Sequence, residues 1–349
     1  MARRPDPLRR SVTSVVVGAL VWLATADLAA AHGPVPAEAP SPTSLLLGWT
    51  FEPLPTLGIA VAALWWRWAV RRVNAQHPAN PVPVRRSVAF AAGLTALAFA
   101  LLSGIDRYDT TLFSVHMAQH VLLTLVAAPL LALAAPITLV LRLVSPETRR
   151  RWILPVLHGR LTRVLAFPVV AWVIFAAVMW VSHFSPLFDA ALEDPLVHDL
   201  EHVLFLGSAL LFWWPAVALD PAPWRMPHPA RVMYVFLQMT QNTLLAVVLL
   251  NVGTVLYPHY ATLVRTWGPS ALEDQGTAAG IMWLAGDGIF LVAIMAIVAG
   301  WMRADVRDTD RADRRASLEM ADIRVRERML AERLAHERED GQRGSGVSR

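Results

Sequence analysis

The stretch Val197–Trp214, VHDLEHVLFLGSALLFWW, joins two histidines to a run of apolar sequence. His198 and His202 stand four residues apart near its start, and no charged residue follows His202 within the stretch. On an α-helix, residues four apart lie on one face about 6 Å from each other, so both imidazoles can reach one metal ion. Because about 20 apolar residues span a bilayer, the stretch indicates a membrane helix with a histidine pair near one end.

The same arrangement occurs upstream, in SVHMAQHVLLTLVAAPLLAL at residues 114–133, where His116 and His120 form the pair. Polar side chains at membrane depth are costly and usually have a partner or a function. A lone histidine of this kind most often bonds to a neighbouring helix, but two matched pairs favour a metal site. The sequence does not show whether the two helices are neighbours.

Apolar residues dominate the whole chain: 55% of its 349 residues are hydrophobic and 17% are charged, whereas a typical soluble domain has about 25% charged residues. We therefore expect an all-α fold, a polytopic transmembrane helix bundle of seven spans plus an N-terminal signal peptide or eighth span. The seven predicted spans cover residues 56–73, 87–104, 111–134, 164–182, 197–218, 231–252 and 278–302.

The N-terminal part of the chain has two interpretations. Four arginines precede an apolar segment, residues 11–31, that ends in small residues, a pattern typical of a cleaved signal peptide and equally of a first span. We accordingly divide the chain into three parts. Residues 1–31 are the signal peptide or first span, and residues 32–302 are a transmembrane domain with an outward-facing histidine site. Residues 303–349 are a charged cytoplasmic tail.

The arginines indicate which loops face the cytoplasm. Loops around residues 67–86 and 142–163 are rich in arginine, whereas those at 105–110, 183–196 and 253–277 are acidic or nearly neutral. By the positive-inside rule the arginine-rich loops, the N-terminus and the tail are cytoplasmic, which places both histidine pairs near the outer ends of their helices. The net charge of +4 reflects this distribution and indicates no affinity for nucleic acid.

The helix starts predict that the two pairs lie at similar depth. Asp194 and Pro195 are a suitable N-cap and first residue for the downstream helix. At 1.5 Å per residue, its two histidines then lie about 6 and 12 Å along the helix. If Asp109 caps the upstream helix, the histidines there lie about 10 and 16 Å along it.

The absence of cysteine excludes disulfides, thiolate metal sites and cysteine nucleophiles. His183, at the outer interface, and Met282, in the last span, are additional candidate ligands. Methionine suits Cu(I), although it is also common as core packing. Asp199 and Glu201 flank the downstream pair and could accept a hydrogen bond from an imidazole N–H of a metal-binding histidine. On an ideal helix, however, they point away from the face of His198 and His202, so we predict no ligand role for them.

Other polar residues have weaker signals. His259, in LYPHY, is expected to be structural, because aromatic residues commonly populate the membrane interface. Polar side chains within one late helix are expected to bond to neighbouring helices; they are Gln238, Gln241 and Asn242. The sequence leaves open the roles of Asp274, Gln275 and Asp287; Asp287 suits a proton relay or a helix–helix hydrogen bond.

Five features occur in order along the chain: SVHMAQHVLLTLVAAPLLALAAP (114–136), HFSPLFDAALEDPLVHDLEHVLFLGSALLFWWP (183–215), Asp220-Pro221, LYPHY (256–260) and EDQGTAAGIMW (273–283). Together they resemble the multispanning CtaG family of cytochrome c oxidase assembly factors. The resemblance extends over most of residues 45–302. It does not include the N-terminal segment or the tail.

This resemblance implies a non-enzymatic assembly factor for haem–copper cytochrome c oxidase, with oxidase subunits and membrane lipid as partners. It also implies a multi-pass protein of the bacterial inner membrane that supplies or inserts copper. Combined with the histidine pairs, it leads to the hypothesis that copper is bound near the outer leaflet. The proposed ligands are His116, His120, His198 and His202, with His183 and Met282 as helpers.

Three alternatives stay open. One histidine from each helix could bind haem in a membrane electron-transfer protein. The pairs could serve a metal-dependent membrane enzyme, or they could pack helices in a structural chaperone without metal. The sequence does not determine the identity or oxidation state of the metal, the oligomeric state, or the oxidase subunit served.

Overall fold

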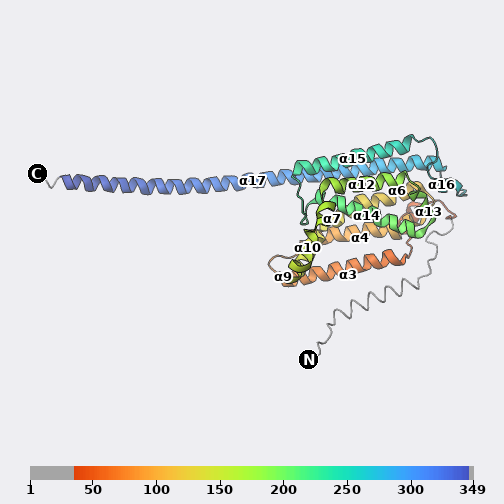
Figure 1. Ribbon diagram of the computed structural model, residues 1–349, viewed down its shortest axis with the longest axis horizontal. Helices are drawn as coiled ribbons and strands as arrows, with labels where there is room; N and C mark the ends of the chain where they lie inside the picture. The colour runs from red at the N-terminus through yellow and green to blue at the C-terminus, as the bar shows by residue number, and fades with distance from the viewer. Residues whose placement is uncertain (1–34, 346–349) are drawn as a thin grey trace, which may run out of the picture. The chain divides into compact units, whose positions relative to one another are not determined.

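The computed structural model describes residues 35–345, and every regular element in that range is a helix (Figure 1). The predicted all-α class is confirmed, and the segment 1–31 lies outside the described residues.

The earlier helices are α2 (Pro42–Leu47), α3 (Pro53–Gln76), α4 (Val84–Leu102), α5 (Gly104–Tyr108), α6 (Phe113–Val121), the π-helical turn η1 (Leu122–Ala127), α7 (Ala128–Ala134), α8 (Pro136–Leu143) and α9 (Pro146–Thr148). The later ones are the π-helical turn η2 (Arg149–Ile153), α10 (Leu154–Leu157), α11 (Arg160–Leu165), α12 (Pro168–His183), α13 (Leu187–Glu193), α14 (Pro195–Val217), α15 (His228–Asn251), α16 (Pro258–Thr262) and α17 (Ala271–Ser345).

Within the described residues, five helical segments are long and apolar enough to cross a membrane. They are Val84–Tyr108, Phe113–Leu143, Pro195–Val217, His228–Asn251 and Ala271–Leu330. The pair α12 and α13, bent by 68°, meets the same criterion together and makes a sixth candidate. Helix α3 has 24 residues, but it carries Arg67, Arg71 and Arg72. Membrane character is therefore supported, and the total of seven or eight spans stays a prediction.

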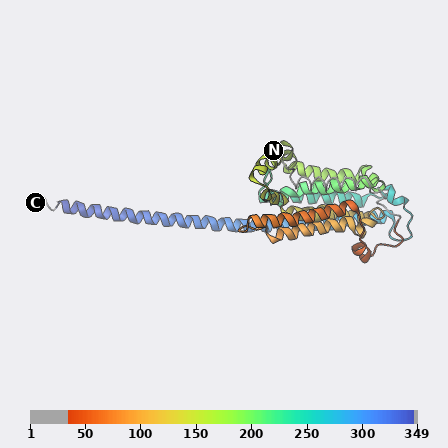
Figure 2. The ribbon, with the colours of Figure 1, turned by 90° about the horizontal axis from the view of Figure 1, so that it is seen from below.

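The chain divides into two compact units, Met1–Val292 and Ala293–Arg349. In the first unit the long helices run side by side (Figures 1 and 2). Helix α4 packs against α7, and α14 contacts both α7 and α12. Small residues permit this approach: a Cβ on Gly93 of α4 would lie 2.9 Å from the Leu131 side chain of α7. Helix α14 thus has neighbours on two sides, which buries its histidine face.

The second unit is helical as far as Ser345, and its described side chains are mostly exposed. Arg311 pairs with Asp308 at 3.0 Å, and Arg326 pairs with Asp322 at 2.7 Å. Oppositely charged residues three or four apart stabilise a solvated helix. This agrees with the expected charged tail, whose cytoplasmic location stays a prediction.

One end of the bundle, which we call the histidine end, gathers the acidic and neutral loops. Tyr257 donates a hydrogen bond to the carbonyl of His183 at 3.1 Å. Tyr260 donates one to the carbonyl of Asp109 at 2.8 Å. These bonds connect three loops that are far apart in the sequence, as the predicted topology requires.

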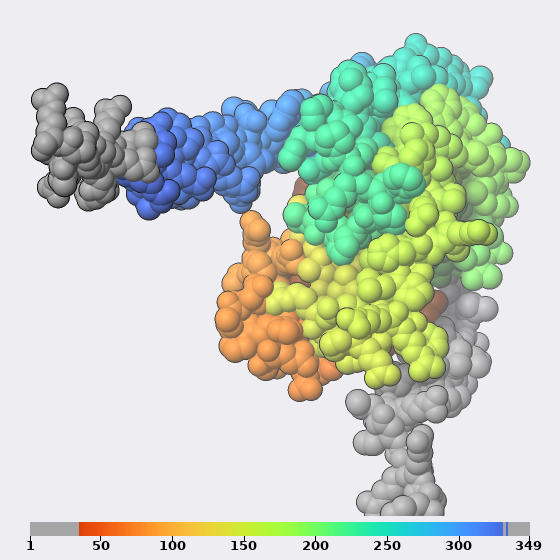
Figure 3. Space-filling model, turned by 60° about the vertical axis from the view of Figure 1, so that its left-hand side comes forward, coloured from red at the N-terminus to blue at the C-terminus, as the bar shows by residue number. Residues whose placement is uncertain are grey.

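The opposite end, which we call the arginine end, gathers the basic loops. Asp220 accepts hydrogen bonds from the backbone nitrogens of Ile137 at 3.0 Å and Thr138 at 2.6 Å, at the start of α8. Figure 3 brings this end forward and shows orange, yellow-green and green segments of the chain side by side. The arginine-rich loops therefore share one end, and the assignment of that end to the cytoplasm stays a prediction.

Candidate metal centre

Helix α14 begins at Pro195, as the sequence predicts. Its N-cap is Asp194, whose Oδ1 accepts hydrogen bonds from the backbone nitrogens of Leu196 at 2.8 Å and Val197 at 3.2 Å. Such a cap satisfies donors that the first helical turn leaves free. It fixes the start of the helix and therefore the depth at which His198 enters the bundle.

Helix α6 begins differently from the prediction. Its N-cap residue is Leu112, and Asp109 instead ends the short helix α5. One free backbone donor of the first turn is satisfied from α17, because Asp274 accepts a hydrogen bond from the Ser114 backbone nitrogen at 3.3 Å. Asp274 also accepts one from the Ser114 hydroxyl at 2.5 Å. This gives Asp274 the role of a cap supplied by a helix 160 residues away in the sequence.

The four predicted histidines are buried and face one another between α6 and α14. Within each pair the ring centroids lie 4.3 Å apart. Between the helices, the rings of His116 and His198 are 5.5 Å apart, and those of His120 and His202 are 6.4 Å apart. The two helices are therefore neighbours, and the pairs lie at the same depth.

Glu201 belongs to this cluster, and the prediction that it points away is wrong. Its side chain is buried, with Oε2 3.7 Å from Nε2 of His116 and 4.0 Å from Nε2 of His120. At about 100° per residue, Glu201 lies only about 60° around the helix from His198, on the side that faces α6. Asp199 is exposed on the other side of α14, as expected.

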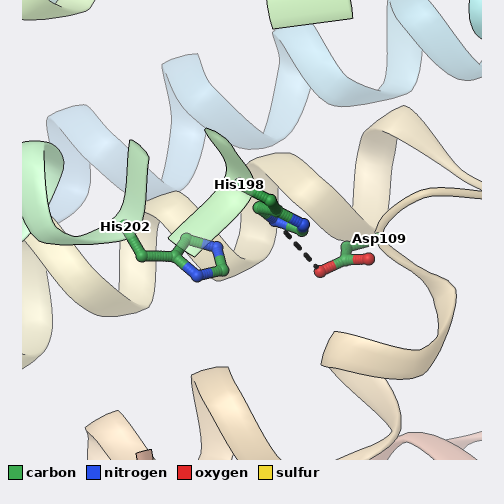
Figure 4. Close-up of side chains that lie close together, drawn as sticks. All are labelled: Asp109, His198 and His202. Carbon is green, nitrogen blue, oxygen red and sulfur yellow. Dashed lines mark ion pairs between the residues drawn. The ribbon is translucent and has the colours of Figure 1, made fainter. Parts of the chain in front are cut away.

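Asp109 is a residue of the cluster that the sequence did not reveal as a ligand. Its buried Oδ2 lies 3.6 Å from Nε2 of His198 (Figure 4). Burial raises the pKa of the Asp109 carboxyl well above its usual range, while hydrogen bonds from Gln119 and the Thr110 backbone oppose the shift. The sequence signal is an aspartate seven residues before His116, but only the folded turn between α5 and α6 directs it toward α14.

The donor atoms form two groups of three, and within each group they lie within 4.8 Å of one another. The groups are His116, His120 and Glu201, and Asp109, His198 and His202. The shortest nitrogen–oxygen separations, 3.6, 3.7 and 4.0 Å, exceed the length of a hydrogen bond. Two ligands about 2.1 Å from one ion, at a right or tetrahedral angle, stand about 3.0 to 3.4 Å apart. If the donor atoms of each group move slightly closer together, their spacing fits a shared cation better than direct hydrogen bonds between histidine and carboxylate.

His183 and Met282, the two additional candidate ligands, have different surroundings in the structure. The ring of His183 lies 6.4 Å from that of His120. His183 Nδ1 donates to the Met179 carbonyl at 2.6 Å, and among the described residues its buried Nε2 has no hydrogen-bond partner. A metal-binding histidine commonly has this arrangement. Met282 is buried, and its carbonyl accepts a hydrogen bond from Asn242 at 3.1 Å. This contact fixes the backbone of Met282 and does not involve its sulfur. Both ligand roles stay predictions.

The LYPHY and EDQ segments hold the loops around the cluster. His259 Nε2 donates to the carbonyl of Thr110 at 2.9 Å, which agrees with its expected structural role. Gln275 accepts a hydrogen bond from the backbone nitrogen of Leu256 at 2.9 Å. The first contact fixes the loop that carries Asp109, and the second fixes the loop before α16.

A separate polar group joins α15 to its neighbours. Asp287 accepts hydrogen bonds from the Thr243 hydroxyl at 2.6 Å and from the Asn242 amide at 3.3 Å. Of the two roles left open for Asp287, this geometry favours a helix–helix hydrogen bond. Gln241 accepts a hydrogen bond from the Trp180 indole at 2.6 Å. The expected interhelical bonding of Gln241 and Asn242 is confirmed.

The fold and the cluster define an α-helical membrane protein with buried histidines and carboxylates near one end of its bundle. The sequence profile of the cytochrome c oxidase caa3 assembly factors (Caa3_CtaG) matches residues 63–304, which is more than half of the chain. The chain belongs to this family, and the resemblance seen in its motifs is confirmed.

Several mycobacterial proteins are similar to this chain. An uncharacterised protein of Mycobacterium bovis and one of Mycobacterium tuberculosis are each 32% identical to it over 295 residues. An uncharacterised protein of Mycobacterium leprae is 30% identical over 295 residues. Each match covers 82% of this chain and 44% of the relative, so the chain spans less than half the length of these curated relatives. No solved structure matches the chain.

Proposed function

We propose that this protein assembles haem–copper cytochrome c oxidase by holding copper at the histidine–carboxylate cluster and passing it to an oxidase subunit. The observation that carries the proposal concerns His116, His120 and Glu201. Within the part of the chain that the structure describes, their ring nitrogens and carboxylate oxygens are buried without hydrogen-bond partners. Each buried polar group left in this way costs about 1–3 kcal/mol. A cation bound between them satisfies all three side chains at once.

Copper suits both the ligands and the family. Neutral imidazole binds copper, zinc and iron, and among divalent first-row metals Cu(II) binds nitrogen and oxygen ligands most tightly. The family is one of cytochrome c oxidase assembly factors. In our proposal copper is the cargo of this protein, and a cargo must be released. Cargo release needs ligands that exchange, and imidazole and carboxylate groups lose a metal when they are protonated.

The burial of the histidines suggests where copper leaves. On α14, His198 is 4% exposed and His202 is 8% exposed, whereas His116 and His120 on α6 are 0% and 1% exposed. We therefore propose that copper exchanges on the α14 side of the histidine end and that the oxidase subunit docks there. In this proposal that end faces outward from the bacterial inner membrane, and the C-terminus is cytoplasmic.

A metal-dependent membrane enzyme is the second candidate, because each group contains one carboxylate. Two histidines and one carboxylate are the ligand set of non-haem iron oxygenases. Glu201 supplies the carboxylate of one group and Asp109 that of the other. Substrate turnover by the purified protein without any oxidase would favour this candidate, whereas membership of an assembly-factor family favours a non-enzymatic role.

Haem fits the cluster less well. The ring of Phe205 stacks on that of His120, with centroids 4.1 Å apart, and the ring of Phe188 lies 4.8 Å from that of His116. Both phenylalanines are fully buried. A porphyrin plane ligated by these imidazoles would need the space that the phenylalanine rings fill.

The proposal is tested in cells that lack their own copy of the gene and carry a variant in its place. We expect the double variant His116→Ala/His202→Ala to lose oxidase activity and copper in the purified oxidase. The matched control is His77→Ala, because His77 is an exposed histidine just after α3. Immunoblots of the membranes establish that each variant is present. Normal oxidase activity and copper content in the double variant would refute the proposal.

A further inference from the structure

The six donor residues form two complete ligand sets. The Glu201 set consists of His116, His120 and Glu201, and the Asp109 set consists of Asp109, His198 and His202. We propose that the protein binds two copper ions, one in each set, and that the ion in the Asp109 set exchanges first. This inference rests on the proposed function for the identity of the metal. It adds the number of ions and the order of their release.

The grouping of the donor atoms supports two ions. Ligands at about 2.2 Å from one ion can stand at most about 4.4 Å apart, on opposite sides of it, so donors that lie within 4.8 Å of one another reach one ion after a small contraction. Among the described residues the donors gather within 4.8 Å as two histidines with one carboxylate, twice, and not as one group of four histidines. Each set therefore has the number of ligands that one ion needs, with further positions open for water or for a ligand from a partner.

The positions of the two buried carboxyl groups support the same conclusion. Asp109 is 0% exposed and Glu201 is 2% exposed. In the described part of the chain, the ion-pair partners of these carboxylates are histidines, at 3.6 to 4.0 Å. A buried carboxylate without a compensating charge is strongly unfavourable. One ion in each set places a cation beside each carboxylate.

The two sets are not equally accessible. The Asp109 set takes its carboxylate from the loop before α6, at the histidine end, and its histidines are the more exposed ones. The donors of the Glu201 set lie within α6 and α14, and its histidines are 0% and 1% exposed. The rings of His116 and His198, one from each set, lie 5.5 Å apart. An ion can thus pass from the Glu201 set to the Asp109 set and leave from there.

The test measures copper per protein in the full chain, purified in detergent from copper-supplied cells. We expect two ions in the wild type and one each in Asp109→Asn and Glu201→Gln, which keep the size of the side chain. The matched control Asp199→Asn, an exposed carboxylate on the same helix, should keep two. A water-soluble copper chelator should remove copper from the wild type in two phases of equal amplitude. Asp109→Asn should lack the fast phase, and Glu201→Gln should lack the slow one.

The outcomes separate this inference from the proposed function. One ion in the wild type, with none in either variant, would mean a single shared site and would overturn the inference while leaving the copper proposal intact. Two ions released in a single phase would overturn the order of exchange. No copper in the wild type would overturn the proposed function and the inference together. Size-exclusion profiles and circular dichroism establish that each variant is folded.

Discussion

Glu201 of α14 and His116 of α6 face each other inside the bundle, with 3.7 Å between Oε2 and Nε2. Both side chains are buried, and this separation is longer than a hydrogen bond. A buried carboxylate in a membrane protein needs a proton or a cation close to it. A cation between Oε2 of Glu201 and Nε2 of His116 would compensate the carboxylate and bind the imidazole at the same time.

Removing the metal should lower the stability of the protein. A ligand that binds only the folded state stabilises it by about 2.7 kcal/mol when its free concentration is 100 times its dissociation constant. We therefore expect copper-loaded wild type to unfold at a higher temperature than chelator-treated wild type, measured by intrinsic fluorescence in detergent. The His116→Ala/His202→Ala variant should show no such difference. Identical midpoints for loaded and stripped wild type would argue against a structural copper ligand set.

The cap that Asp274 provides for α6 should be energetically coupled to Ser114. Loss of a side-chain cap costs about 0.5–2 kcal/mol, and the Asp274 carboxylate accepts both the Ser114 backbone nitrogen and its hydroxyl. We expect Asp274→Ala to lower the unfolding midpoint more than Ser114→Ala, because the serine substitution leaves the backbone bond in place. In a double-mutant cycle the two substitutions should be non-additive. Additive effects would mean that the two residues do not interact.

Asp220 should stabilise the arginine end without affecting the metal. Its carboxylate accepts hydrogen bonds from the backbone nitrogens of Ile137 and Thr138 and from the Thr138 hydroxyl, the last at 2.6 Å. Removing a buried acceptor leaves its donors unsatisfied and costs about 1–3 kcal/mol. We expect Asp220→Ala to lower the unfolding midpoint and to leave the copper content unchanged. A large loss of copper in this variant would show that the two ends are coupled.

The residue that ends α14 should tolerate glycine better than the wild-type alanine. Ala218 has φ of 53° and ψ of 32°, a left-handed conformation that costs an L-residue about 1–2 kcal/mol relative to glycine. We expect Ala218→Gly to raise the unfolding midpoint. The control is Ala209→Gly, in the buried interior of the same helix, which should lower it because glycine there costs about 0.5–1 kcal/mol. The same direction of change in both variants would contradict this interpretation.

Features set by local chemistry could be predicted from the sequence. The cap formed by Asp194 and Pro195 depends on neighbouring residues, and it is confirmed. The spacing of His198 and His202 depends only on the pitch of a helix, and both are buried on one face. The separation of basic from acidic loops follows from membrane topology, and the loops do gather at opposite ends of the bundle.

Features set by contacts between distant segments could not be predicted. Asp109 joins the cluster because the chain turns between α5 and α6, and a spacing rule contains no information about that turn. Glu201 faces α6 because of the way α14 is rotated in the bundle, whereas an isolated helix offers several orientations. The cap on Ser114 comes from Asp274, whose position depends on the packing of α17. Asp109, Glu201 and Asp274 are all acidic and buried, and the burial of an acidic residue cannot be predicted from composition.

The most direct test of the central claim is the metal and haem content of the purified full chain, with wild type beside the His116→Ala/His202→Ala variant. Copper in the wild type, its loss in the variant, and no haem absorption band in either would support the copper centre. The absence of copper from wild type prepared with added copper, or equal copper in both proteins, would contradict it.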